Sequence, residues 1–151
     1  MTQDVTFREA QRADVPAVVA LLRDDVLGAG REDCDPQVYL RAFDAMAAEG
    51  GNTLIVGETG GRIVATLQLT LISGLSLRAS RRAQIESVRV AGDCRGLGIG
   101  EAMIADAEAR ARAAGCRLMQ LTMNATRDDA RRFYERAGFT PSHVGFKKPL
   151  G

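Results

Sequence analysis

The stretch IESVRVAGDCRGLGIGEAMIADAEARARAAG, residues 85–115, decides the fold. Residues 84–90 predict a strand, the segment 95–100 is rich in glycine, and residues 100–114 predict a helix that ends at Gly115. Glycines between a strand and a helix let a ligand approach the backbone, and the helix N-terminus attracts anions. The turn therefore predicts a phosphate site to which Arg95 adds charge. The alternative is a tight glycine turn without a ligand.

Two common phosphate motifs do not fit this turn. The dinucleotide pattern Gly-x-Gly-x-x-Gly, begun at Gly96, requires a glycine where Glu101 stands. The nucleoside-triphosphate loop requires a Gly-Lys pair, which the chain does not contain. The residues match Arg-x-x-Gly-x-Gly instead, in Arg95, Gly98 and Gly100.

Outside this stretch, periodicity predicts a mixed order of strands and helices. Asp14 is expected to cap the first helix, and the predicted hairpin turns at 59–61. The breaks between elements are too short to separate domains, so residues 1–151 form one domain. The fold class is α/β (α+β), with a mixed central sheet of about six or seven strands and about four helices. Strands are predicted at 5–8, 53–58, 62–72, 84–90 and 117–123, with one or two more in 139–150, and further helices at 36–49 and 128–137.

Composition excludes several classes of protein. The 151 residues are 46% hydrophobic, and 20 basic side chains against 19 acidic ones leave a net charge of +1. This balance argues against a nucleic-acid partner, and no apolar run reaches the ~20 residues of a membrane span. No secretion signal is recognised, so a cytoplasmic location is expected. Cys34, Cys94 and Cys116 lack a Cys-x-x-Cys pair, so reduced thiols and no metal site are predicted.

Three motifs in order give the chain a resemblance to the GCN5-related N-acetyltransferase (GNAT) superfamily. They are the glycine turn with its preceding strand, Asn124 at the end of a later strand, and FYERAGF at 133–139. The resemblance runs from TFREAQRADVPAVVALL to GFKKPL and implies acetyl-CoA as co-substrate. It assigns the pyrophosphate to the turn, and the pantetheine arm and acetyl carbonyl to the backbone of the preceding strand. Asn124 would bond the cofactor arm or cap the break before the last helix. The implied cofactor residues are Val88, Arg89, Val90, Arg95, Gly96, Leu97, Gly98, Ile99, Gly100 and Asn124.

The implied reaction is attack of an amine on the acetyl thioester. A lysine-like amine has a pKa of ~10.4, so removing its proton at pH 7 costs roughly 4–5 kcal/mol. A base on the amine side therefore matters more than an acid on the sulfur side. Glu86 is the predicted general base, because strand alternation gives it the same face as Val88 and Val90. Tyr134 is the predicted general acid for the thiolate. The alternatives are a surface or salt-bridged glutamate and a core tyrosine.

The predicted function is acetyl-CoA-dependent N-acetylation of a primary amine of a small molecule. The alternatives are acetylation of a protein N-terminus or lysine, and a non-catalytic acyl-CoA-binding sensor or partner module. Arg78, Arg81 and Arg82 would grip an acidic acceptor or form a solvated loop. His143 is expected at the surface or in a structural hydrogen bond rather than in catalysis. A homodimer is possible.

Overall fold

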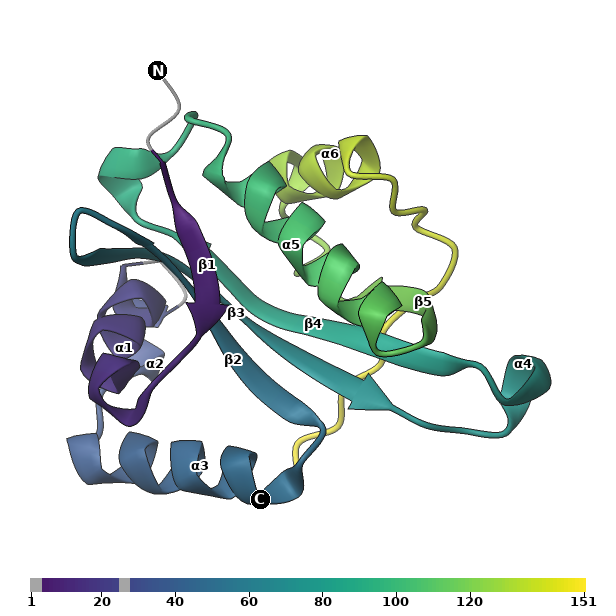
Figure 1. Cartoon of the computed structure of the whole chain (residues 1–151), viewed down its shortest axis with the longest axis horizontal. Helices are drawn as coiled ribbons and strands as arrows, with labels where there is room; N and C mark the ends of the chain where they lie inside the picture. Colours follow the sequence, from purple (N-terminus) through teal and green to yellow (C-terminus); the bar gives the residue numbers. More distant parts are fainter. Residues whose placement is uncertain (1–3, 25–27) are drawn as a thin grey trace.

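The computed structural model describes residues 4–24 and 28–151 (Figure 1). A strand opens the described chain, helices follow, two strands then form a hairpin, and helices alternate with the last two strands. In chain order the elements are β1 (Thr6–Glu9), η1 (Arg12–Asp14), α1 (Val15–Arg23), α2 (Gly28–Arg31), α3 (Pro36–Glu49), β2 (Asn52–Thr59), β3 (Arg62–Ile72), α4 (Ser76–Ala79), β4 (Arg81–Val90), η2 (Gly92–Cys94), α5 (Ile99–Ala113), β5 (Cys116–Leu121) and α6 (Asp128–Arg136).

The strands form one mixed sheet in the order β1-β2-β3-β4-β5. All neighbours are antiparallel except β4 and β5, which are parallel. The predicted mixed sheet and single domain are confirmed, but the described residues form five strands instead of six or seven. The strands predicted within 139–150 are absent from the structure. Alternating side chains predict an extended backbone, whereas a strand also needs a hydrogen-bonded neighbour, and this segment has none in the described chain.

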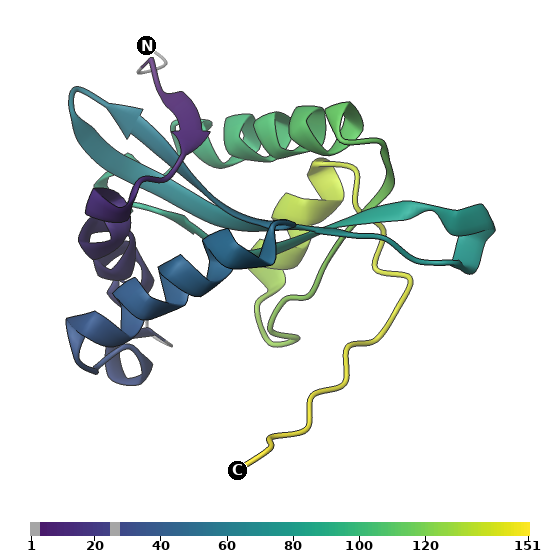
Figure 2. The same ribbon diagram turned by 60° about the horizontal axis from the view of Figure 1, so that its bottom comes forward.

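Helices cover both faces of the sheet. Figure 2 shows α5 above the sheet and α1 and α3 below it. Alternate residues of β3, including Leu67 and Leu69, are buried in the same cluster as Met103 and Ile104 of α5. This packing fixes α5 against β3 and β4.

Several element boundaries differ from the sequence predictions, and two helices were not predicted. β4 begins at Arg81 rather than at 84, and β5 ends at Leu121 rather than at 123. Two short helices, Gly28–Arg31 and Ser76–Ala79, lie in segments predicted as breaks. None of the described helices is both long and apolar enough to cross a membrane.

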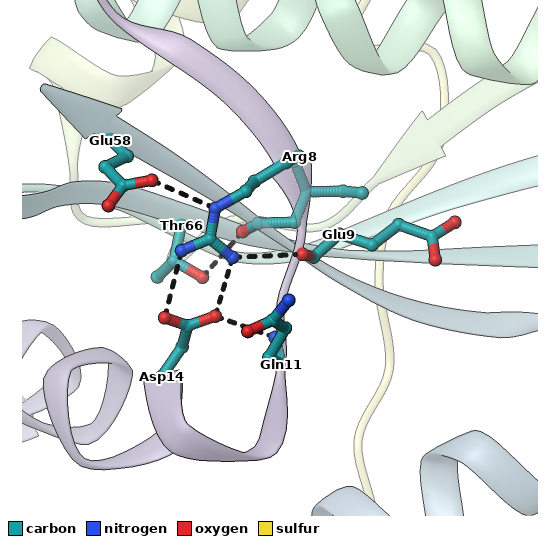
Figure 3. A network of polar contacts seen from close by, with 7 residues as sticks. Arg8, Glu9, Gln11, Asp14, Glu58 and Thr66 are labelled. Carbon is teal, nitrogen blue, oxygen red and sulfur yellow. Dashed lines mark hydrogen bonds and ion pairs between the residues drawn. The ribbon is translucent and has the colours of Figure 1, made fainter. Parts of the chain in front are cut away.

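A polar network joins β1, β2 and the start of α1 (Figure 3). Arg8 contacts the carboxylate of Asp14 at 2.7 and 3.0 Å and that of Glu58 at 3.0 Å. Asp14 also accepts a hydrogen bond of 2.7 Å from the backbone N–H of Gln11. Asp14 stands at the N-cap of α1 but makes no side-chain cap there, because its carboxylate is already engaged. Bonding to Arg8 lowers the pKa of Asp14.

Candidate active site

The glycine turn leads from the end of β4 into α5. Gly96 and Gly98 have φ values of +78° and +79°, in the left-handed region where a Cβ is unfavourable. Gly98 is the N-cap of α5, and its carbonyl accepts the backbone N–H of Ala102 at 3.1 Å. The first N–H groups of this 15-residue helix therefore lack intrahelical acceptors, as at any helix start. The predicted anion-binding site is thus the N-terminus of α5, which follows two glycines in the left-handed conformation.

Arg95 stands at the entrance of this turn with an exposed side chain. One of its terminal nitrogens lies 3.5 Å from the backbone oxygen of Asp24, a long contact that leaves most of the guanidinium in solvent. The Asp24 carboxylate accepts the backbone N–H of Gly92 at 3.2 Å. Arg95 is therefore available for an anion at the helix N-terminus.

β4 and β5 separate at a defined residue pair. Their parallel pairing runs from Arg81 opposite Cys116 to Ile85 opposite Leu121, where β5 ends. β4 continues to Val90 and is paired there only with β3, so residues 86–90 have one backbone edge that no described strand covers. We call the open region between β4 and β5 the wedge. It begins at Glu86, ends next to the glycine turn, and contains the predicted residues Val88, Arg89 and Val90.

A β-bulge lies at the mouth of the wedge. Glu86 is opposite Gln68 and Arg89 is opposite Thr66, so two residues of β4 face the single residue between them on β3. Ser87, one of the two, has a φ of +54°, which is strained for a residue with a side chain. The bulge therefore turns the backbone of β4 where the open edge starts.

The bulge overturns the predicted alternation of Glu86, Val88 and Val90. Residues opposite each other in a ladder point to the same face of the sheet. Glu86 is opposite Gln68 and points away from α5, whereas Val90 is opposite Ala65, a member of the core beneath α5. The extra residue shifts the alternation by one, so Glu86 and Val90 lie on different faces.

Neutral amide side chains surround Glu86 on the face away from α5. Gln68 and Thr70 both donate to Asn52 Oδ1, at 2.9 and 3.1 Å, and Gln120 donates to Gln84 at 2.7 Å. We call Asn52, Gln68, Gln84 and Gln120 the amide stripe. The Glu86 side chain is exposed, and within the described residues it takes part in no ion pair. The surface alongside the wedge is thus polar and carries one unpaired carboxylate.

Arg81 and Arg82 of the predicted arginine cluster bond to groups other than Glu86. Arg81 donates to the backbone oxygen of Ala114 at 2.7 Å. Arg82 donates to Ser76 at 2.9 Å and lies 3.4 Å from Gln120, at the end of the amide stripe. The arginine cluster is therefore partly structural, and only Arg82 of these two contacts the stripe.

Tyr134 lies in α6, half-buried between two aromatic rings. Its ring meets Phe133 and Phe139 edge to face, with centroids 5.1 and 5.9 Å away. Burial raises the pKa of Tyr134, opposed by the positive charges of Arg127 and Arg89. The phenol consequently stays protonated at neutral pH, as a general acid must be. Tyr134 packs against the same core cluster as Val88 and Val90 of β4.

Phe133 positions α6 against the glycine turn. A Cβ added to Gly100 would lie 3.2 Å from Cζ of Phe133, so only a glycine fits without displacing that ring. The two glycines of Gly-x-Gly are therefore required for different reasons. Gly98 adopts the left-handed backbone conformation, and Gly100 allows Phe133 to pack closely against the helix.

Two other predicted residues occupy simple surroundings. Asn124 Oδ1 accepts from the backbone N–H of Thr126 at 3.0 Å and from its hydroxyl at 2.7 Å, which is the capping role left open above. His143 is exposed, with Nδ1 2.6 Å from the Ser142 hydroxyl. The three cysteines are free thiols, and in the described residues no cluster of three or more His, Cys, Asp or Glu side chains could hold a metal.

Comparison with known proteins identifies the family. The acetyltransferase (GNAT) family model matches residues 15–139. The aminoalkylphosphonate N-acetyltransferase of Salmonella typhimurium strain LT2 is 31% identical over 144 residues, 95% of this chain and 90% of that protein. The wedge beside the start of α5 thus belongs to an acyl-transferring enzyme. The chain belongs to the GNAT family and is an acetyl-CoA-dependent N-acetyltransferase.

Solved structures agree on the fold. A structure from Bacillus halodurans C-125, named as a transcriptional regulator, has a TM-score of 0.92 and 44% identity, covering 97% of this chain and 99% of that one. An acetyltransferase from Clostridium acetobutylicum, solved with acetyl-CoA, has a TM-score of 0.74 and 19% identity, covering 95% and 96% of the two chains. The second likeness concerns the fold alone.

Proposed function

We propose that this enzyme acetylates the primary amine of a small molecule by direct attack on acetyl-CoA, with Glu86 as general base and Tyr134 as general acid. The observation that carries the proposal is the uncovered backbone edge of β4, which begins at Glu86 and ends beside the glycine turn. One end of this edge offers the Glu86 carboxylate to the amine acceptor. The other end offers an anion-binding site to the pyrophosphate of acetyl-CoA.

The cofactor would fill the wedge as an extra strand. Its pantetheine arm contains two amides, which can hydrogen-bond with the backbone of Val88, Arg89 and Val90 as a neighbouring strand does. A backbone N–H near Val88 would polarise the acetyl carbonyl and stabilise the oxyanion. Asn124 remains a proposed second contact to the arm. The pyrophosphate would bind the turn formed by Arg95, Gly96, Leu97, Gly98, Ile99 and Gly100.

The proposed chemistry balances with these groups and bulk water, which takes the protons that the amine releases through Glu86 and returns one to the Tyr134 phenolate after each turnover. The amine nitrogen attacks the acetyl carbon, the carbon–sulfur bond breaks, and an amide and a thiol result. The amine proton passes to Glu86, and its exposed position favours transfer through a water. The departing thiolate takes a proton from Tyr134, whose raised pKa keeps that proton available. Because a free thiol has a pKa of about 8.5, the acid contributes less than the base at neutral pH.

The acceptor is proposed to be a small, polar amine. The amide stripe next to Glu86 offers hydrogen-bond donors and acceptors, and Arg82 at its end adds one positive charge. The Salmonella relative, by its name, acts on aminoalkylphosphonates, which pair an amine with an anionic group. We therefore propose an amine that carries an anionic group as the first acceptor to test.

The test combines binding and turnover. Titration calorimetry with CoA and a thiol-release assay with acetyl-CoA and a panel of amines, aminoalkylphosphonates included, are the measurements. Failure of CoA to bind would refute the cofactor seat. Glu86→Gln should lower kcat/KM most at low pH, with the loss shrinking as the pH approaches the pKa of the amine. Glu9→Gln, an exposed glutamate on β1 at the other edge of the sheet, is the matched control and should keep full activity.

A sensor is the second candidate, because the Bacillus halodurans structure with 44% identity is named as a transcriptional regulator. A sensor would bind acetyl-CoA and release no thiol with any amine. Glu86→Gln and Tyr134→Phe would then leave its ligand affinity unchanged and would have no rate to alter. A pH-dependent loss of turnover in Glu86→Gln supports the enzyme instead.

A further inference from the structure

The bulge in β4 brings a second charged side chain to the face of Glu86. Glu86 is opposite Gln68 of β3. Arg89 is opposite Thr66, which lies two residues from Gln68 on the same strand. Residues two apart on a strand point to the same face, and so do residues opposite each other in a ladder. In a regular strand positions 86 and 89 would lie on different faces, whereas the extra residue of the bulge places both on the face away from α5.

The Arg89 guanidinium lies against the backbone of the wedge. Its Nη1 donates to the backbone oxygen of Val88 at 2.9 Å, and the side chain is half-buried. The acetyl carbonyl of the cofactor is proposed to bind at the backbone near Val88. The positive charge of Arg89 is thus held beside the proposed reaction centre, where partial burial strengthens its attraction for an anion because water screens it less.

Arg82 is another cation on this face of β4, but it lies farther from Glu86. Arg82 is opposite Ile72, four residues along β3 from the partner of Glu86. At about 3.4 Å per residue, these two positions are about 14 Å apart, whereas the positions of Glu86 and Arg89 are about 7 Å apart. The Arg82 guanidinium also donates to Ser76 of α4 at 2.9 Å, beyond the end of β3. A short molecule with an amine at Glu86 therefore reaches Arg89 sooner than Arg82.

We propose that the Arg89 side chain binds the anionic group of the acceptor, so that the enzyme selects amines that carry a carboxylate or phosphonate on a short linker. This inference rests on the proposed function and names the residue that sets its specificity. The planar guanidinium donates two parallel N–H bonds to the oxygens of such a group. The amine then lies towards Glu86, while the backbone of Arg89 contributes to the proposed site of the pantetheine arm. One residue thus aligns the acceptor with the thioester.

Kinetics with matched amines test this assignment. 2-Aminoethylphosphonate and β-alanine carry an anion on a short linker, and 2-methoxyethylamine is of similar size without one. Arg89→Gln should lower kcat/KM at least about 30-fold more for the two anionic amines than for 2-methoxyethylamine, because a charge-assisted pair of hydrogen bonds is lost. The difference should appear mainly in KM, since Arg89 binds the acceptor and moves no proton. Arg89→Lys keeps the charge without the paired donors and should restore part of the selectivity.

Linker length gives a second measurement on the wild type. β-Alanine should have a kcat/KM at least about tenfold above that of 6-aminohexanoate, whose longer linker does not fit between Glu86 and Arg89. A loss in Arg89→Gln that is confined to phosphonates or to carboxylates supports the proposal and identifies the anion. Arg112→Gln is the matched control, because Arg112 is an exposed arginine of α5 on the other face of the sheet, and it should keep the wild-type selectivity.

Calorimetry separates this inference from the proposed reaction. Titration of 2-aminoethylphosphonate into the enzyme saturated with CoA measures acceptor binding without turnover, and the CoA affinity of each variant shows that it is folded. Arg89→Gln should bind 2-aminoethylphosphonate at least about 30-fold more weakly than the wild type. Binding that depends on Arg89 while no amine is acetylated would refute the proposed function and leave the anion site standing. Equal losses for charged and uncharged amines, an unchanged affinity in Arg89→Gln, or a loss of selectivity in Arg82→Gln instead would each overturn the role of Arg89.

Discussion

The strained bulge at Ser87 gives the sharpest prediction about the wedge. Ser87 has a φ of +54° and an exposed side chain. A left-handed conformation costs a residue with a Cβ roughly 1–2 kcal/mol, and glycine avoids this strain. Glycine also adds roughly 0.5–1 kcal/mol of backbone entropy loss on folding. We therefore expect Ser87→Gly to raise the free energy of unfolding by about 0.5–1 kcal/mol and to keep acetyl transfer.

Two further variants at this position separate backbone strain from side-chain chemistry. Ser87→Ala removes the hydroxyl and keeps the strain, so its stability should stay within about 0.5 kcal/mol of the wild type. Ser87→Val is expected to lower both stability and activity, because a β-branched residue is a severe outlier at this φ. Either the bulge persists at a cost above about 2 kcal/mol, or it flattens and turns residues 88–90 to the other face.

Urea unfolding and the kcat/KM of thiol release are the measurements for this series. Ser87→Val should be less stable than the wild type and at least about tenfold less active. Equal stability of the glycine and valine variants would refute the role of the bulge. Loss of activity in the alanine variant would show instead that the hydroxyl takes part in the reaction.

Three further changes test the helix that carries Tyr134, the glycine turn and the polar network. Tyr134→Phe removes only the hydroxyl, so kcat should fall by about 10–100-fold with CoA affinity unchanged. Because burial raises the pKa of Tyr134 above 10, the pH–rate profile of the wild type should show no loss of activity from deprotonation of Tyr134 below pH 10. Gly100→Ala places a Cβ 3.2 Å from Phe133, which should displace α6, lower stability by about 1–3 kcal/mol and weaken CoA binding in calorimetry. Arg8 lowers the pKa of Asp14, so the ionised carboxylate stabilises the fold above the unfolded value of 3.8 and this contribution disappears as the pH falls through the folded value. Asp14→Asn should therefore lower the melting temperature at pH 7, and the difference from the wild type should shrink as the pH falls below 3.8.

The order of elements follows from sequence periodicity because most of β2, β3 and α5 bury one regular face. β3 shows this best: Leu67 and Leu69 alternate with polar residues and are buried as predicted. The bulge was missed, although the sequence carries a signal for it. Apolar residues stand at Ala83 and Ile85 and then at Val88, so the period of two shifts by one between them. Regular alternation across that shift predicts one face for Glu86 and Val90, whereas the structure places them on opposite faces of the sheet.

The wedge and the C-terminal segment depend on pairing between distant residues, which periodicity does not report. Where β4 loses its neighbour is decided by the end of β5 at Leu121, after which Asn124 forms a capping turn with Thr126. The amide stripe likewise draws its members from four strands, and each member alone looks like an ordinary polar residue of a half-exposed sheet. The strands predicted within 139–150 are absent from the structure, because a strand needs a hydrogen-bonded neighbour, which the pattern of a single segment does not identify.

Two irregularities of the sheet act together at one place. The early end of β5 leaves backbone groups of residues 86–90 unpaired, and the bulge at Ser87 turns those groups at the start of the gap. A backbone group without a partner is unfavourable unless water or a ligand satisfies it, so a ligand with its own amides replaces water there at little structural expense. Recognition through the backbone tolerates changes of side chain at Val88 and Val90, while it depends strictly on where β5 stops and how β4 bends. In the proposed binding mode the cofactor would need few side chains, and these would stand outside the wedge: Arg95 at the glycine turn and Tyr134 on the neighbouring helix.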